Sequence, residues 1–178
     1  LTKKTGPKKT TGLYAYDRKT TKITLIFNDP NFDIDSYIRE PGSGVIVGVK
    51  TMTDKVNYHF FDGNNDFVKL FERLAATFPN HDVSVSATSL NDKLYRIAIR
   101  SDRTPLDFYL YEPEKQSVNY LASAKEWFTE KDMLPQKFIS FKARDGETIY
   151  GYLTLPKNSN KPLPLVVNVH GGPYGVQD

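Results

Sequence analysis

The sequence predicts a mainly β fold of short antiparallel strands with one inserted helix. Three observations lead to this prediction. The 178 residues include 11 Tyr, 11 Phe and 11 Pro, a composition that favours strands joined by many turns. One hairpin pattern occurs twice along the chain, and β-prone runs of strand length are separated by turn residues.

The repeated hairpin pattern indicates a repeat architecture. The sequence Tyr-Ala-Tyr-Asp at 14–17 resembles Tyr-Leu-Tyr-Glu at 109–112, 95 positions later (Tyr16 to Tyr111). Residues 23–26 match 118–121 at the same offset. Two blades of a β-propeller span about 80–100 residues, so we expect antiparallel blades of β-propeller type, with Tyr16 and Tyr111 at equivalent places. A β-sandwich has similar strand spacing and stays open as an alternative.

Between and beyond the two hairpins, the pattern predicts further strands and one helix. Three strands are expected within 35–61, and a four-stranded unit is expected from Asp82 to Leu121. A helix is expected over 65–77, with Asn64 or Asn65 at its start and Pro79 after its end. Its apolar residues recur at spacings of three and four, namely Phe67, Leu70, Phe71, Leu74, Ala75 and Phe78.

The chain is expected to have four parts. Residues 1–11, with four lysines among Thr, Gly and Pro, are expected to form a flexible arm at the cut end of a longer protein. Residues 12–122 form the blades, and 123–136 form a linker. A capping-box spacing that begins at Ser123 allows a short helix over 124–133. Residues 137–178 carry a different pattern.

Composition and charge exclude several classes of function. The chain has no Cys, which excludes disulfides, thiolate metal sites and a Cys nucleophile. A net charge of +3 gives no electrostatic footprint for nucleic acid, and no apolar run approaches the ~18 residues of a membrane span. Asp29, Asp33 and Asp35 lack the spacing of a calcium loop, so neither a metal nor a cofactor is expected.

The C-terminal part contains the pattern that carries chemistry. Strands are expected over 138–143 and 148–155, joined by a tight turn at Asp145-Gly146, and an apolar strand over 163–169 leads into His170. Ligand sites of α/β sheets lie just past the carboxyl ends of such strands, and two glycines there expose backbone N–H groups. On spacing alone, an ordinary turn at 170–173 stays equally open.

These residues resemble the prolyl oligopeptidase family of serine peptidases, most closely its acylaminoacyl-peptidase-like branch. The resemblance covers roughly 138–178 and lies in Arg-Asp-Gly at 144–146, Gly-Tyr-Leu-Thr-Leu-Pro at 151–156 and His-Gly-Gly-Pro at 170–173. It implies that a β-propeller precedes an α/β-hydrolase domain, of which 137–178 would be the N-terminal part. It also implies hydrolysis of peptide or acyl-peptide bonds by a Ser-Asp-His triad.

The resemblance assigns roles to the glycine loop. Gly172 would be a backbone donor of the oxyanion hole, Gly171 would allow the close approach, and His170 would support the loop. The triad residues follow this loop in the family, and the chain has no Gly-x-Ser-x-Gly, so the chain is expected to be an inactive fragment. His59 and His81 lie in the blade region and are interpreted as structural.

Two alternatives remain: a non-catalytic β-rich binding module, or an esterase of the same superfamily. The expected partner is a peptide substrate of the full-length protein, with no nucleic acid and no membrane. Exposed strand edges of the blades would also favour pairing with a second copy.

Overall fold

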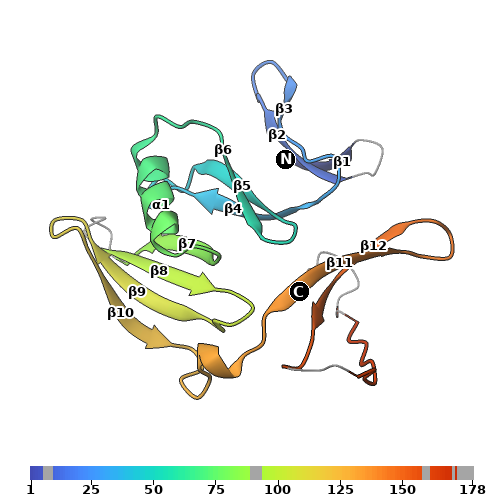
Figure 1. The fold of residues 1–178 in the computed structure, drawn as a ribbon. Helices are drawn as coiled ribbons and strands as arrows, with labels where there is room; N and C mark the ends of the chain where they lie inside the picture. Colours follow the sequence, from blue (N-terminus) through green and yellow to red (C-terminus); the bar gives the residue numbers. More distant parts are fainter. Residues whose placement is uncertain (6–9, 89–93, 158–160, 170, 172–178) are drawn as a thin grey trace. The chain divides into compact units, whose positions relative to one another are not determined.

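A computed structural model of the chain describes residues 1–5, 10–88, 94–157, 161–169 and 171 (Figure 1). These residues form antiparallel sheets with one α-helix, which confirms the predicted mainly β fold. They divide into two compact units, Leu1–Pro79 and Asn80–Val169. The Asn-Asp pair at 91–92, which favours a turn within the unit expected over 82–121, lies outside the described residues.

The first sheet has the order β1-β2-β3, with β1 at Thr2–Thr5, β2 at Thr10–Tyr16 and β3 at Ile23–Phe27. Strand β1 lies in the segment that was expected to be a flexible arm. It pairs antiparallel with β2 from Thr2↔Leu13 to Thr5↔Thr10. Backbone pairing with β2 therefore orders this end of the chain as a strand.

The second sheet has the order β4-β5-β6, with β4 at Ile34–Arg39, β5 at Ile46–Met52 and β6 at Val56–Phe60. Its central strand supplies buried side chains, among them Val49 and Thr51. The strands β5 and β6 approach closely at Gly48, where an added Cβ would lie 2.7 Å from the carbonyl oxygen of His59. Only glycine fits this position without a shift of the backbone.

Helix α1, at Asp66–Thr77, confirms the predicted helix. The side chain of Asn65 caps it by accepting a hydrogen bond from the Val68 amide at 3.0 Å. Phe71 is fully buried and packs edge-on against Tyr58 and Phe60 of β6, with ring centroids 5.1 and 5.4 Å apart. The helix thus buries its apolar face against the sheet that precedes it in the chain.

The third sheet is a four-stranded meander with the order β10-β9-β8-β7. Its strands are β7 at Asp82–Ala87, β8 at Tyr95–Arg100, β9 at Asp107–Glu112 and β10 at Ser117–Ser123. This sheet confirms the predicted unit over 82–121. Alternate residues from β7, β8 and β9 on one face are buried, namely Val83, Ile97, Ile99 and Tyr111.

The hairpins β2–β3 and β9–β10 confirm the predicted equivalence. Tyr16 pairs with Ile23, and Tyr111 pairs with Val118, at the offset found in the sequence. Counted from the turn, each hairpin has a register shift directly after its second tyrosine, beyond the pair Tyr14↔Leu25 in one and Tyr109↔Tyr120 in the other. Both turns hold a residue at positive φ, Thr21 at 56° and Gln116 at 49°. The two hairpins therefore repeat in pairing and in turn geometry.

The short helix that the capping-box spacing allows over 124–133 is not formed. The chain forms a turn after β10 and a short 3₁₀ helix, η1, at Glu130–Asp132. The Ala124 amide donates to the Leu106 carbonyl at 2.9 Å, which extends the pairing of β10 past the residue that was expected to cap the helix. Ser123 Oγ instead accepts a hydrogen bond from the Lys125 amide, as in a turn.

Candidate functional site

The C-terminal part of the chain begins with a two-stranded hairpin. Strand β11, at Gln136–Lys142, pairs antiparallel with β12, at Thr148–Thr154, from Gln136↔Thr154 to Lys142↔Thr148. Gly146 adopts φ 87° in the connecting turn, and its amide donates to the Ala143 carbonyl at 3.0 Å. This geometry confirms the predicted Asp-Gly turn. Glycine is favoured at the position because a left-handed backbone costs it little.

Both faces of the β11–β12 hairpin carry apolar side chains. Phe138 on one face stacks on Tyr150, with ring centroids 5.5 Å apart, and also contacts Tyr152. Phe141 and Ile149 lie on the other face and are exposed. Strands that are apolar on both faces are typical of a sheet covered on both sides.

The strand expected over 163–169 is not formed. Residues 162–169 have no regular secondary structure, and their apolar side chains are strongly exposed, Val166 by 87%. A parallel strand forms only beside a neighbour that satisfies its backbone N–H and C=O groups. In the described part of the chain this segment pairs with no other strand, so its sequence preference for a strand is not realised.

The glycine loop follows this apolar segment. Gly171 is exposed in a bend, and no atom lies within 4 Å of a Cβ built on it. The described residues therefore leave space on the side of Gly171 where a side chain would stand. His170 and Gly172, the other two predicted site residues, lie outside the described residues, as does Pro173.

The two histidines of the blade region each bond to a buried threonine. His59 Nε2 lies 3.0 Å from Thr51 Oγ1, and the ring packs against Phe27 with centroids 4.7 Å apart. His81 Nε2 lies 3.1 Å from Thr104 Oγ1. These contacts fit the structural interpretation of both side chains.

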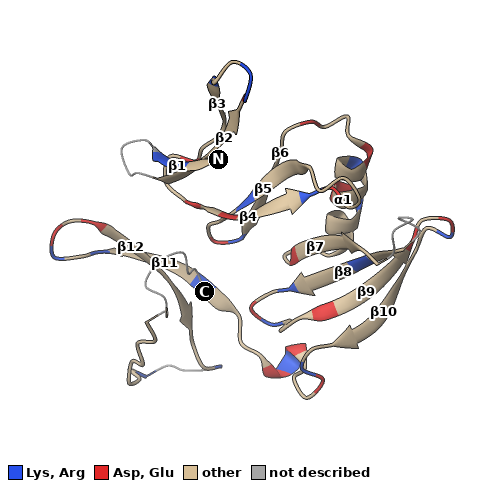
Figure 2. Cartoon of the chain, turned by 180° about the vertical axis from the view of Figure 1, so that it is seen from behind, with Lys and Arg blue, Asp and Glu red and all other residues tan. Residues whose placement is uncertain are grey.

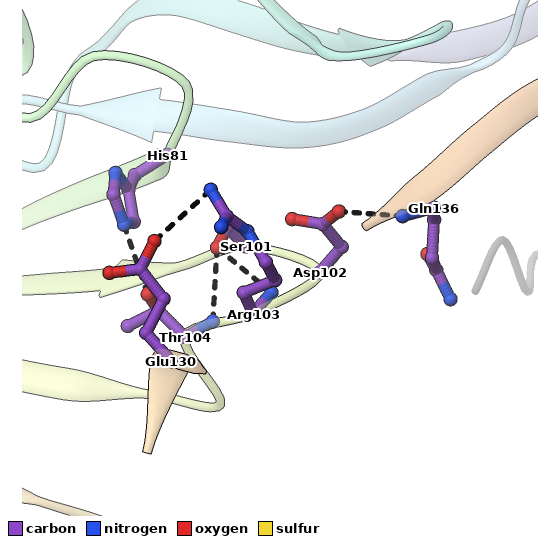
Figure 3. A network of polar contacts seen from close by, with 7 residues as sticks. All are labelled: His81, Ser101, Asp102, Arg103, Thr104, Glu130 and Gln136. Carbon is purple, nitrogen blue, oxygen red and sulfur yellow. Dashed lines mark hydrogen bonds and ion pairs between the residues drawn. The ribbon is translucent and has the colours of Figure 1, made fainter. Parts of the chain in front are cut away.

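A polar network fixes the start of the β11–β12 hairpin to the four-stranded sheet (Figure 3). We call residues 101–104, between β8 and β9, the anchor loop. Asp102 Oδ2 accepts a hydrogen bond from the Gln136 amide at 2.8 Å, and Arg103 Nη2 lies 3.1 Å from Glu130 Oε1. The anchor loop thus contacts the hairpin directly at Gln136 and, through Glu130, the 3₁₀ helix η1 that precedes the hairpin.

The network contains Ser, His and Asp side chains, but their bonds are not those of a catalytic triad. A triad requires a hydrogen bond from the serine to the histidine and another from the histidine to the carboxylate. Ser101 Oγ instead accepts the amides of Arg103 and Thr104, at 3.1 and 3.0 Å. Figure 3 shows Asp102 turned toward Gln136 and His81 toward Thr104.

Sequence reasoning missed the roles of Asp102, Arg103 and Glu130. The Ser-Asp-Arg-Thr-Pro stretch at 101–105 carries a turn signal, since a serine oxygen can accept the amides two and three residues later. No local signal pairs Asp102 with Gln136, because the two are 34 residues apart.

The described residues contain neither a cluster of metal-ligating side chains nor a long apolar helix. Among them, no group of three or more His, Asp or Glu side chains could hold a metal ion. No helix in this part of the chain is long and apolar enough to cross a membrane.

Figure 2 shows charges of both signs at the β11–β12 turn and around η1.

Two curated proteins match nearly the whole chain. Dipeptidyl aminopeptidase BIII of Pseudoxanthomonas mexicana is 30% identical over 174 residues, which cover 93% of this chain and 25% of that protein. Dipeptidyl peptidase family member 6 of Caenorhabditis elegans is 26% identical over 171 residues, or 84% of this chain and 23% of that protein. The chain is related to peptidases. It spans about a quarter of the length of both relatives, and no protein-family model matches it.

Proposed function

We propose that this chain is part of a serine peptidase of the prolyl oligopeptidase family, in its acylaminoacyl-peptidase-like branch. The observation that carries the proposal is the 30% identity to a peptidase over 93% of the chain. In this proposal residues 12–122 are β-propeller blades, and 137–178 are the first part of an α/β-hydrolase domain. The triad of Ser, Asp and His lies downstream of residue 178, so the 178-residue chain alone is inactive.

The glycine loop would supply part of the transition-state stabilisation. Attack on a carbonyl places negative charge on its oxygen, and backbone N–H groups aimed at that oxygen stabilise the charge. The Gly172 amide is our candidate donor, with Gly171 allowing close approach and His170 supporting the loop.

For the substrate, we propose peptides from which dipeptides are released. The support is the names of both relatives, each of which specifies a dipeptidyl peptidase. This substrate separates the proposal from its two alternatives. Neither a binding module without catalysis nor an esterase would cleave the amide bond of a chromogenic dipeptidyl amide.

The test measures hydrolysis by the natural full-length protein. We expect it to cleave dipeptidyl amides faster than aminoacyl amides, N-acylaminoacyl amides and simple esters, and to react with a fluorophosphonate at a serine beyond residue 178. The 178-residue chain should do neither. Preference for esters would favour the esterase, and neither cleavage nor labelling would favour the binding module.

Gly172→Pro in the full-length protein tests the oxyanion assignment. Proline has no N–H, so one donor is lost, and kcat should fall by about 10²–10³-fold. His170→Ala should reduce kcat less, since that residue only supports the loop. Unchanged turnover of Gly172→Pro in a folded protein would refute the donor role.

A further inference from the structure

The anchor loop is built as a rigid connection. Ser101 Oγ accepts two amides of the loop, and the Ser101 amide donates to the Thr104 carbonyl at 2.9 Å. On one side Thr104 Oγ1 lies 3.1 Å from His81 Nε2, just before β7. The turn therefore has a defined shape before it contacts any later segment.

On its other side, the anchor loop holds the segment between the sheet and the hairpin at two points. Arg103 pairs with Glu130 of η1, and Asp102 accepts the amide of Gln136, the first residue of β11. A third contact comes from the chain just after β12, where Lys157 Nζ lies 3.4 Å from the Lys131 carbonyl oxygen. Both ends of the hairpin are thus tied near η1.

Because these contacts lie at the root of the hairpin, a small change in them would move the hairpin tip by a larger distance. Each strand of the hairpin has seven residues, and at about 3.4 Å per residue it extends roughly 24 Å from its root. A rotation of about 10° at Gln136 would move the hairpin tip by roughly 4 Å. Catalytic geometry is sensitive to displacements of about 1 Å.

We propose that Asp102 and Arg103 are positioning residues, which fix the direction in which the β11–β12 hairpin leaves the four-stranded sheet. Through the hairpin they also set the placement of the segment that leads to the glycine loop. This second part rests on the proposed peptidase function, whereas the fixing of the hairpin root does not.

The first test measures hydrogen–deuterium exchange in the full-length protein. Asp102→Ala removes the acceptor of the Gln136 amide, and we expect exchange at the start of β11 to become about tenfold faster. Asp17→Ala is the matched control, because Asp17 also accepts backbone amides, those of Lys19 and Thr20, but only within its own turn. The control should leave exchange of β11 unchanged.

The second test exchanges the charges of the ion pair. Arg103→Glu and Glu130→Arg should each lower kcat about two- to fivefold with little change in KM, and the double variant should restore it. Rescue by the double variant separates positioning from a loss of fold, since two damaging substitutions in a collapsed site would not correct each other.

The outcomes separate the inference from the proposed function. Unchanged exchange at β11 in folded Asp102→Ala overturns the anchoring role whether or not the protein is a peptidase. Faster exchange with unaltered kcat in the active enzyme overturns the positioning of the active site. Faster exchange in a protein that cleaves no peptide refutes the proposed function and leaves the anchor supported.

Discussion

Tyr16 in β2 and Tyr111 in β9 hold equivalent places in two hairpins, yet 46% of Tyr16 is exposed and only 7% of Tyr111. The hairpins share their pairing, their register shift and the positive-φ residue of the turn. What differs is the neighbouring strand. Tyr111 pairs with Tyr95 of β8, whereas β1 pairs with β2 only up to Leu13.

The outer strands of the two hairpins support this explanation. Leu25 of β3 and Tyr120 of β10 are equivalent, both lie on edge strands, and they are similarly exposed, by 52% and 58%. The local sequence thus sets the hairpin geometry, while burial depends on whether a further strand pairs with the inner one.

The largest expected effect is the difference in stability loss when Tyr111 or its equivalent Tyr16 is replaced by alanine. Tyr111→Ala should lower the free energy of unfolding by about 3 kcal/mol, because it leaves a cavity beside Tyr95 and the buried residues of the sheet. Tyr16→Ala should cost under about 1 kcal/mol, because much of its ring already contacts water. Urea unfolding of both variants measures the difference, and equal losses would break the comparison.

The same contrast explains which parts of the fold were predictable from sequence. The tyrosine spacing predicts the register of both hairpins, and the spacing of Phe67, Phe71 and Leu74 predicts α1, because these patterns are local. The segment 163–169 has the composition of a strand, but a strand also requires a partner.

The candidate site was predictable only in part. The Asp145-Gly146 turn follows from its two residues, since Gly146 adopts the left-handed conformation that this turn requires. The anchor contacts depend on where folding brings Asp102 and Arg103, and the sequence around them gives no sign of Gln136 or Glu130.

A smaller effect would sharpen the comparison at the turns. Thr21 and Gln116 both adopt positive φ, a conformation that asparagine tolerates better than either residue. Thr21→Asn should stabilise the protein by about 1 kcal/mol and Gln116→Asn by about 0.5 kcal/mol, because a β-branched side chain is more strained there. Thermal unfolding checks both values, and destabilisation by either variant would contradict the shared turn geometry.

The smallest expected effect is a difference in pH response between the turns. Asp17 and Glu112 occupy equivalent positions at the start of the two turns. The amides of Thr20 and Lys19 bond to the Asp17 carboxylate and lower its pKa below the usual 3.8. In the other turn, Glu112 accepts a hydrogen bond from Lys115 at 2.7 Å and raises the pKa of that lysine above 10.5.

These directions give opposite pH windows. A lowered carboxyl pKa stabilises the folded turn above pH 3.8, and this contribution is lost as the pH falls through the folded value. A raised lysine pKa stabilises its turn below pH 10.5, and this contribution is lost as the pH rises through the folded value. Carbon-13 NMR titration of Asp17 Cγ and Lys115 Cε measures both, with Asp17→Asn as the variant that removes the acid response of the first turn alone. If Asp17 titrates at or above 3.8, the backbone amides do not hold its charged form, and the two turns differ less than their contacts indicate.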